Sequence, residues 1–464
     1  MTQRFVVIGA GVAGLAAARA LKLGAPSAEV VLLERSERIG GLVLTERTPD
    51  GFLLEHGPDS LLEGKPAGMR AIAETGISDE VVSAPAGVRK SFVAREGRLY
   101  PLPPGLISGR ASATAMMTAP LFTMAGRARM AMEPFMPQRE GTDDESVASF
   151  FERRFGQEMV DRLIEPVFRG VYTTPTTKLS VRAVMPHLAM LEQKYGSLAR
   201  AMASRASLSG SDSPAAPTVV TLRSGMGALP TALARALEGS IRLGVTATRL
   251  RRTPSGLTIS LGEHGELEAN GVVVATPAPA AARLLADLDP AVADSLGAIG
   301  VGRLDTVTFG FWRKDLDHPL EGTGFVVDAN EKCALTACTW SSSKWVGRAP
   351  DDSALIRCFL AAPGATDEEL VASARDDLRA LMGIPLAIKP RFTRVWRLSQ
   401  SLPRYEVGYM ERAAETLERV AQLPDVAVAG NAYNGMGVPD CIASGLAAAA
   451  RLLGTTEPAS PPAH

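Results

Sequence analysis

The chain has 464 residues, with 49 Lys and Arg against 50 Asp and Glu and a formal net charge of −1. This length predicts two or three domains, and the charge balance argues against a nucleic-acid-binding protein. The four cysteines form no CxxC pair, so we expect no metal site and no disulfide framework, and a reducing compartment is favoured. The sequence holds no run of about 20 apolar residues and no signal peptide, so no membrane span is predicted.

A dinucleotide-binding motif occupies the N-terminus. An apolar strand over 4–8 leads into a turn with Gly9, Gly11 and Gly14, then a helix, then a second strand that ends at Glu34. The first glycine makes the turn, the second admits a pyrophosphate, and the third lets helix pack on strand. The phosphates would lie at the helix N-terminus, with Glu34 accepting from a ribose hydroxyl. The predicted site also includes the intervening residues Ala10, Val12 and Ala13. The alternative is a glycine turn used only for packing.

A second glycine turn, Gly40-Gly41, follows soon after Glu34. Nicotinamide enzymes need no such turn, whereas an elongated flavin cofactor runs on across the sheet toward the substrate. Glu34 followed by Gly40-Gly41 resembles the fingerprint of the flavin-containing amine oxidase superfamily, which implies bound FAD. We include Arg35 and Leu42 in the predicted cofactor site.

The C-terminus supplies a second half of the same site. A buried strand ends at Gly430 and a helix begins near Pro439, which suits the first helical position. The amides of Met436, Gly437 and Val438 are therefore predicted to face an anion. A reduced flavin carries negative charge that a helix N-terminus stabilises. An ordinary capped helix is the alternative.

The helical middle of the chain resembles the oxygen-dependent protoporphyrinogen oxidases of haem synthesis. The most family-specific stretch is Arg169-Gly170-Val171-Tyr172, and further matches lie at 57–60, 99–105, 225–230 and 402–405. The resemblance covers nearly the whole chain. It implies an α/β + α fold, in which a discontinuous Rossmann-like FAD domain of the glutathione-reductase type carries a mixed-sheet substrate domain and a helical membrane-associating domain. It also implies a homodimer.

The domain boundaries follow from composition and this resemblance. We assign residues 1–88, 216–285 and 394–464 to the FAD domain, 89–215 to the helical and substrate-pocket domain, and 286–393 to the substrate-binding sheet. Residues 201–217 are rich in Ser, Ala and Pro and are predicted to form a surface loop.

The resemblance also implies individual contacts. The segment Gly57-Pro58-Asp59-Ser60 and Trp396 would contact the cofactor, and the backbone of Val245 would close over the adenine. Because Ile241, Leu243 and Val245 alternate with polar residues, a half-buried strand is expected there. For Val245, core packing is the alternative.

Substrate contacts are implied in the same way. Gly170 would present its carbonyl to the central pyrrole nitrogens, and Phe325 and Val326 would line an apolar pocket, with a turn glycine and core packing as the alternatives. The family pairs an arginine with a propionate where this chain has Ser91. We therefore choose Arg95 as the propionate ligand, from a basic rim that also holds Arg89 and Lys90. A solvated charge is the alternative for Arg95.

The chemistry of a porphyrinogen explains why no catalytic side chain is predicted. Two pyrroles delocalise the positive charge left when a methylene hydride departs, and the acidified N–H can lose its proton to water. The resemblance implies three such steps, with the flavin reoxidised by O2 to give H2O2. The protein would then contribute by positioning the substrate against the flavin and by tuning how readily the flavin accepts electrons.

One segment suggests attachment to the cytoplasmic face of a membrane. Residues 101–137 are rich in apolar side chains and methionine, with Arg110, Arg127 and Arg129 at the edges. A lid or a dimer contact is the alternative. Four other functions remain open: a coproporphyrinogen III oxidase, an amine oxidase, a carotenoid desaturase, and a flavin-free prenyl-binding escort protein.

Overall fold

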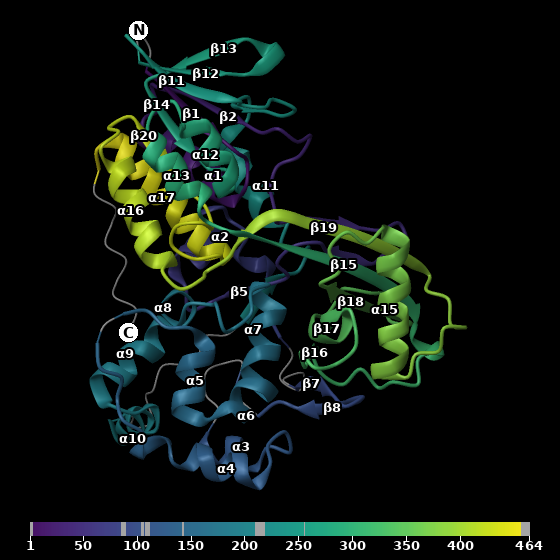
Figure 1. The fold of residues 1–464 in the computed structure, drawn as a ribbon. Coiled ribbons are helices and arrows are strands. Elements are labelled where there is room, and N and C mark those ends of the chain that lie inside the picture. The colour runs from purple at the N-terminus through teal and green to yellow at the C-terminus, as the bar shows by residue number, and fades with distance from the viewer. Residues whose placement is uncertain are drawn as a thin grey trace.

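The computed structural model describes residues 3–84, 90–103, 106, 112–141, 143–208, 219–254 and 256–455. They form three bodies, which Figure 1 shows as a parallel sheet with its helices at the top, a second sheet at the right and a helical body at the lower left. The predicted Arg89 and Arg110, and residues 209–217 of the predicted loop, lie outside the described residues, whereas residues 201–208 form the end of helix α10 (Leu198–Leu208) and not a loop.

The first body is a five-stranded parallel sheet with strand order β10-β2-β1-β14-β20. Its strands are apolar runs, as expected where both faces are covered: β1 Arg4–Ile8, β2 Glu29–Leu33, β10 Ile241–Arg242, β14 Gly271–Val274 and β20 Val426–Val428. Because side chains alternate along β1, Phe5 and Val7 pack under helix α1 (Val12–Gly24) while Val6 and Ile8 join the core on the opposite face. Helix α17 (Val438–Leu453) packs on α1, so the two ends of the chain meet.

Smaller elements surround this sheet. Strand β3 (Thr45–Arg47) pairs with β4 (Leu53–Glu55). Strand β9 (Val219–Leu222) pairs with β5 (Leu61–Leu62) and β6 (Val81–Ser83), and strand β12 (Gly256–Ser260) pairs with β11 (Arg249–Thr253) and β13 (Glu266–Ala269). The helices are α2 (Pro66–Glu74), α11 (Ala228–Ala234), α12 (Ala278–Leu285), α13 (Pro290–Gly297) and α16 (Tyr409–Ala421). The strand expected through Val245 ends earlier, since β10 stops at Arg242 and Leu243 is exposed.

The second body is a seven-stranded sheet with strand order β19-β15-β18-β17-β16-β7-β8. Its strands are β19 Phe392–Pro403, β15 Val301–Trp312, β18 Ser353–Leu360, β17 Leu335–Trp340, β16 Gly324–Val327, β7 Ser91–Arg95 and β8 Arg98–Pro101. Helix α15 (Asp367–Met382) covers one face and begins with a capping box between Thr366 and Glu369.

Two sequence-based boundaries differ from this arrangement. The β7–β8 hairpin, which we grouped with the helices, pairs with β16 and extends the second sheet. Helix α13, which we grouped with the second sheet, packs on α12 and α16 beside the parallel sheet. β7 and β16 are far apart in sequence, as are α13 and α16, so composition could not reveal these contacts.

The third body is helical and contains α3 (Ala113–Thr118), α4 (Met124–Ala131), α5 (Val147–Phe155), α6 (Gln157–Met159), a π-helical turn (Val160–Ile164), α7 (Glu165–Tyr172), α8 (Val181–Val184), α9 (Pro186–Tyr195) and α10 (Leu198–Leu208). A buried ion pair between Arg154 and Glu133 holds it together. Glu133 also accepts hydrogen bonds from Ser197 Oγ and from the amides of Leu198 and Ala199 at the start of α10. No helix of the described residues is long and apolar enough to cross a membrane.

Candidate functional site: a cofactor cradle facing a second sheet

The two glycine turns and the start of α17 form one structure, which we call the cofactor cradle. Gly9 has φ +105°, and a Cβ at Gly14 would lie 1.8 Å from the Gly9 carbonyl oxygen, so Gly14 is required for packing. A Cβ at Gly11 would meet no atom of the chain within 4 Å. Gly11 is therefore the glycine that leaves space, and no side chain caps the N-terminus of α1 behind it. Open space in front of a free helix N-terminus fits a pyrophosphate.

The second turn lies directly against the first. The Gly40 amide donates to the Ala10 carbonyl at 2.8 Å, and a Cβ at Gly41 would lie 3.0 Å from Gly11 Cα. A Cβ at Gly57 would lie 1.8 Å from the carbonyl oxygen of Leu42. Gly57 is thus packed against the residue that follows the second glycine turn.

Glu34 lies at the carboxyl end of β2. Its carboxylate accepts from the Ala10 amide at 2.8 Å, and from the amide and hydroxyl of Ser36 at 2.9 and 2.8 Å. A carboxylate can accept about four hydrogen bonds, which leaves capacity for a ribose hydroxyl. The next residue, Arg35, is exposed. The Val245 amide donates to the Glu34 carbonyl at 2.9 Å, so only the Val245 carbonyl remains for an adenine.

The start of α17 differs in part from the prediction. The Gly437 amide donates to the Asp440 carboxylate at 3.1 Å, so only Met436 and Val438 of the predicted trio can still turn an amide to a ligand. Asp440 is paired in turn with Lys65, at 2.6 Å. An acidic residue in the first turn offsets part of the helix dipole. Cys441 lies inside the helix, where burial and then Asp440 raise the pKa of its thiol to about 12, so its reactive thiolate form is disfavoured.

Trp396 lies on β19, beside the cradle. Its ring is 4.8 Å from the ring of His56 and 5.7 Å from the Arg38 guanidinium, which donates to the Gly41 carbonyl at 2.8 Å. Burial lowers the pKa of His56, although Glu46, hydrogen-bonded at 2.8 Å, acts in the opposite direction. Neither Arg38 nor His56 was predicted, because only the fold brings them to Trp396.

The register of the second sheet defines the surface that faces the cradle and the helices. Trp396 pairs with Thr306, Thr306 with Phe359, Phe359 with Ala337, and Ala337 with Val326. Paired residues share one face of a sheet, so these five side chains form one row. We call it the substrate row. Four of the five are only half-buried; Thr306 is the buried one.

Gly170 lies on the substrate row. A Cβ on it would lie 3.4 Å from Val326 Cγ1 and 3.5 Å from Ala337 Cβ. Because α7 ends at Tyr172, the Gly170 carbonyl belongs to the last turn and has no intrahelical partner. The structure thus brings Gly170 and Val326 together and leaves that carbonyl available to a ligand.

Phe325 and Arg95 lie elsewhere. Phe325 is on the opposite face of β16 from Val326, in the core under α15, so we withdraw it as a pocket residue. Strand alternation is the reason. Arg95 is 2.7 Å from the buried carboxylate of Asp328, which neutralises its charge. Lys90 pairs with Glu321 at 3.8 Å, and Ser91 bonds to Thr323.

A charged group joins the second sheet to segment 55–60, and of its members the sequence analysis named only Asp59, as a cofactor contact. We call it the junction cluster: Glu55, Asp59, Lys344, Arg348 and Arg357. Lys344 Nζ is 2.7 and 3.0 Å from the Asp59 carboxylate oxygens, and Arg357 donates to the carbonyls of Gly57 and His56 at 2.7 and 2.8 Å. Arg348 Nη2 lies 3.7 Å from Glu55 Oε1. The partners are up to 301 residues apart in sequence, so no local signal could have found them.

Burial changes the acidity of this cluster. Burial raises the pKa of Glu55 to about 7, against the hydrogen bonds from Thr45 and the Met226 amide. Burial also lowers the pKa of Arg357 to about 10. For Asp59, burial would raise the pKa, but the charge and hydrogen bonds of Lys344 outweigh it and hold that pKa well below its usual range. Asp59 is therefore ionised at neutral pH.

Comparisons with known proteins agree with this geometry. Residues 12–453 match the model of the flavin-containing amine oxidoreductases. The chain is 33% identical to the coproporphyrinogen III oxidase of Bacillus subtilis over 96% of this chain and 97% of the relative, and 27% identical to a chloroplastic protoporphyrinogen oxidase of Spinacia oleracea over 97% and 84%.

Solved structures share the fold. A protein from Exiguobacterium sp. 255-15, provisionally named protoporphyrinogen oxidase, superposes with a TM-score of 0.85 at 30% identity, over 98% of this chain and 99% of the other. The cyclohexylamine oxidase of Brevibacterium oxydans superposes with a TM-score of 0.70 at 17% identity, over 98% and 99%, which shows the fold alone. The chain binds FAD, and it belongs to the flavin-containing amine oxidoreductase family, with relatives named coproporphyrinogen III oxidase and protoporphyrinogen oxidase.

Proposed function

We propose that this protein oxidises coproporphyrinogen III to coproporphyrin III in haem biosynthesis. The observation that carries the proposal is similarity over almost the whole chain to coproporphyrinogen III oxidases, at 33% identity for Bacillus subtilis and 30% for Staphylococcus aureus. Our sequence analysis placed protoporphyrinogen IX first and this substrate second. The relatives favour the reverse order, because the plant protoporphyrinogen oxidases are only 27% identical.

The residues around the substrate row support a flat, apolar macrocycle. Val326, Ala337 and Phe359 offer apolar contacts, and the Gly170 carbonyl can accept from a pyrrole N–H. Bound FAD supplies the hydride acceptor. The chain has then to place a methylene bridge, hold the pyrrole nitrogens and exclude water, and the departing proton needs no strong side-chain base.

Coproporphyrinogen III carries four propionates, two more than protoporphyrinogen IX, so cationic groups should separate the two substrates. Arg169 precedes Gly170 on α7 and is half-buried, and the structure shows no carboxylate within 4.0 Å of it among the described residues. Arg95, by contrast, is paired with Asp328. We therefore propose Arg169 rather than Arg95 as a propionate ligand.

The deciding experiment is anaerobic reduction of the bound flavin by each porphyrinogen, followed by its absorbance. Coproporphyrinogen III should bleach the flavin with the higher ratio of reduction rate constant to dissociation constant. Faster bleaching by protoporphyrinogen IX would contradict the assignment. Arg169→Met should raise the KM for coproporphyrinogen III more than that for protoporphyrinogen IX, and Arg98→Met, an exposed change on β8, should affect neither. O2 is the proposed acceptor, and H2O2 formed in equal amount to flavin turnover would support it.

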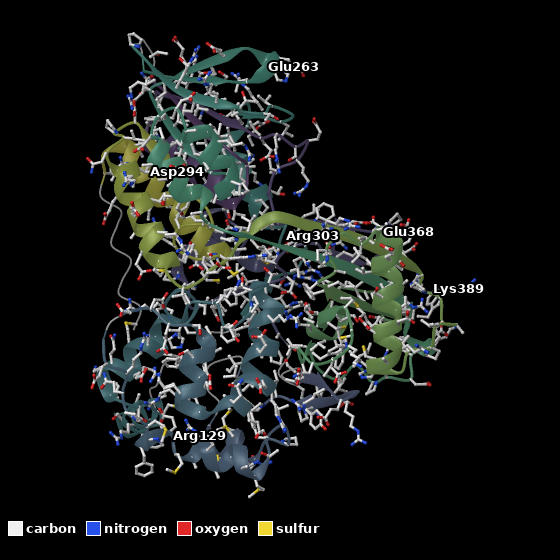
Figure 2. The ribbon with its side chains drawn as sticks, in the orientation of Figure 1. Arg129, Glu263, Asp294, Arg303, Glu368 and Lys389 are labelled. Carbon is white, nitrogen blue, oxygen red and sulfur yellow. The ribbon has the colours of Figure 1, made fainter. Side chains whose placement is uncertain are left out.

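We also propose peripheral attachment to the cytoplasmic face of a membrane, and a homodimer, as the resemblance implies. Met124, Met132 and Phe135, in and after α4 at the bottom of Figure 1, are exposed by 76, 48 and 72%. Two of the arginines expected to face lipid headgroups instead bond within the protein. Arg127 donates to the Ala119 carbonyl, and Arg129, labelled in Figure 2, donates to carbonyls at the end of α5. Binding to vesicles should therefore depend on the apolar side chains, and Phe135→Ser should weaken flotation with anionic vesicles.

A further inference from the structure

The junction cluster lies where segment 57–60 separates the cofactor cradle from the second sheet. Lys344 follows β17 in the short helix α14 (Ser341–Lys344), and Asp59 lies two residues after Gly57, which packs against Leu42 next to the second glycine turn. The Lys344 and Asp59 side chains are each 21% exposed, so the pair borders open space and is not sealed in the core. Trp345 Nε1 adds a third contact to Asp59, at 3.3 Å.

Two charged groups flank the cradle, the Asp440–Lys65 pair and the junction cluster, and they differ in net charge. At the start of α17, the charges of Asp440 and Lys65 cancel, and the Asp440 carboxylate already accepts a hydrogen bond from the Gly437 amide. At segment 55–60, three cations (Lys344, Arg348 and Arg357) face two carboxylates (Asp59 and Glu55). This side therefore carries a net positive charge of one unit when Glu55 is ionised, and of two when it is protonated.

We propose that Lys344 is a positioning residue that sets the reduction potential of the bound flavin, with Asp59 as the counterion that limits its effect. A two-electron reduction leaves negative charge on the flavin, and a nearby cation stabilises that reduced form more than the oxidised one. Of the two single variants below, one removes a positive charge next to segment 57–60 and the other removes a negative charge there. The two variants should therefore shift the flavin potential in opposite directions. The inference rests on bound FAD and not on the identity of the porphyrinogen.

The test measures the two-electron potential of the FAD-loaded protein, by equilibration with reference dyes and without any porphyrinogen. Lys344→Met should lower the potential and Asp59→Asn should raise it, each by about a tenfold change in the reduction equilibrium, or about 30 mV. Sulfite binding at the flavin is a second readout, and its affinity should fall in Lys344→Met and rise in Asp59→Asn.

Two controls separate charge from damage to the fold. Lys344→Arg keeps the charge and should keep the wild-type potential. Lys389→Met removes a lysine charge from the outer edge of the second body, labelled in Figure 2, and should leave the potential unchanged. If both pair variants lower the potential, or if neither moves it while FAD remains bound, the pair is only a structural tie and the proposal is wrong.

Discussion

The cofactor cradle and the junction cluster touch the same segment of chain but are built from different groups. The two glycine turns of the cradle consist of backbone amides, glycines and one carboxylate, Glu34, and their contacts with each other join residues close in sequence, whereas the start of α17 comes from the other end of the chain. The junction cluster consists of side-chain charges from β18, from α14 and the residues after it, and from the end of β4 and the segment that follows. A backbone site fails when a Cβ intrudes, whereas a charged site fails when a partner is removed or protonated. The two regions should therefore respond to different substitutions.

The largest effect is expected at Gly14. Gly14→Ala places a Cβ against the Gly9 carbonyl oxygen, a backbone atom that cannot move aside cheaply, so unfolding should become easier by about 3 kcal/mol or more. Gly11→Ala is the matched control, since its Cβ meets no atom of the chain. Gly11→Ala should keep the denaturation midpoint of the apoprotein and weaken FAD binding. An equal loss of apoprotein stability in both variants would contradict the assignment of Gly14 to packing within the chain and of Gly11 to leaving space for the cofactor.

Removing a buried cation should come next. Arg357→Met leaves the carbonyls of His56 and Gly57 without their donor and should lower the free energy of unfolding by about 3 kcal/mol. Arg379→Met removes an exposed arginine whose one ion pair among the described residues is with Asp376, and it should cost about 0.5 kcal/mol or less. Urea unfolding of the FAD-saturated proteins measures both. If the two variants lose equal stability, segment 55–60 is not held by the second sheet.

Glu55 should make stability depend on pH. Its folded pKa of about 7 exceeds the ordinary 4.5, so its contribution is fully present below pH 4.5 and is lost as the pH rises through 7. The difference corresponds to at most about 3 kcal/mol between pH 4.5 and 8. Glu55→Gln should remove this slope and gain stability relative to the wild type as the pH rises. Parallel stability curves for the two proteins from pH 5 to 8 would show that Glu55 titrates normally.

The smallest effect belongs to Glu34. Glu34→Ala leaves a ribose hydroxyl and the Ala10 amide without an acceptor, and FAD affinity should fall by about 1–3 kcal/mol. Glu34→Gln keeps an acceptor and should lose less. Fluorescence titration of the apoprotein with FAD gives both affinities. Unchanged affinity in Glu34→Ala would mean that the carboxylate serves the loop at Ser36 and not the cofactor.

The sequence was most informative where structure depends on local spacing. Gly9, Gly11, Gly14 and Glu34 lie within one strand–turn–helix–strand unit, so their arrangement follows from the periods of helix and strand. It was least informative at the second sheet. Phe325 and Val326 are neighbours in sequence, and without the strand direction their faces could not be assigned; the structure sends one to the core and the other to Gly170. The sequence left Arg95 free to bind a propionate, whereas the structure pairs it with Asp328.

The sequence by itself therefore determined the cofactor class and the β1–α1–β2 unit of the first body. Glycines with distinct steric roles and an acid at the end of a strand leave few alternatives, because each is required by backbone geometry within about thirty residues. Only the tertiary structure decided the junction cluster and the substrate row. The junction cluster depends on contacts between segments hundreds of residues apart, such as Arg357 with Gly57 and Lys344 with Asp59, and the substrate row depends on the register of four strand pairs. Such contacts are set by sheet order and register, which neither composition nor local periodicity specifies.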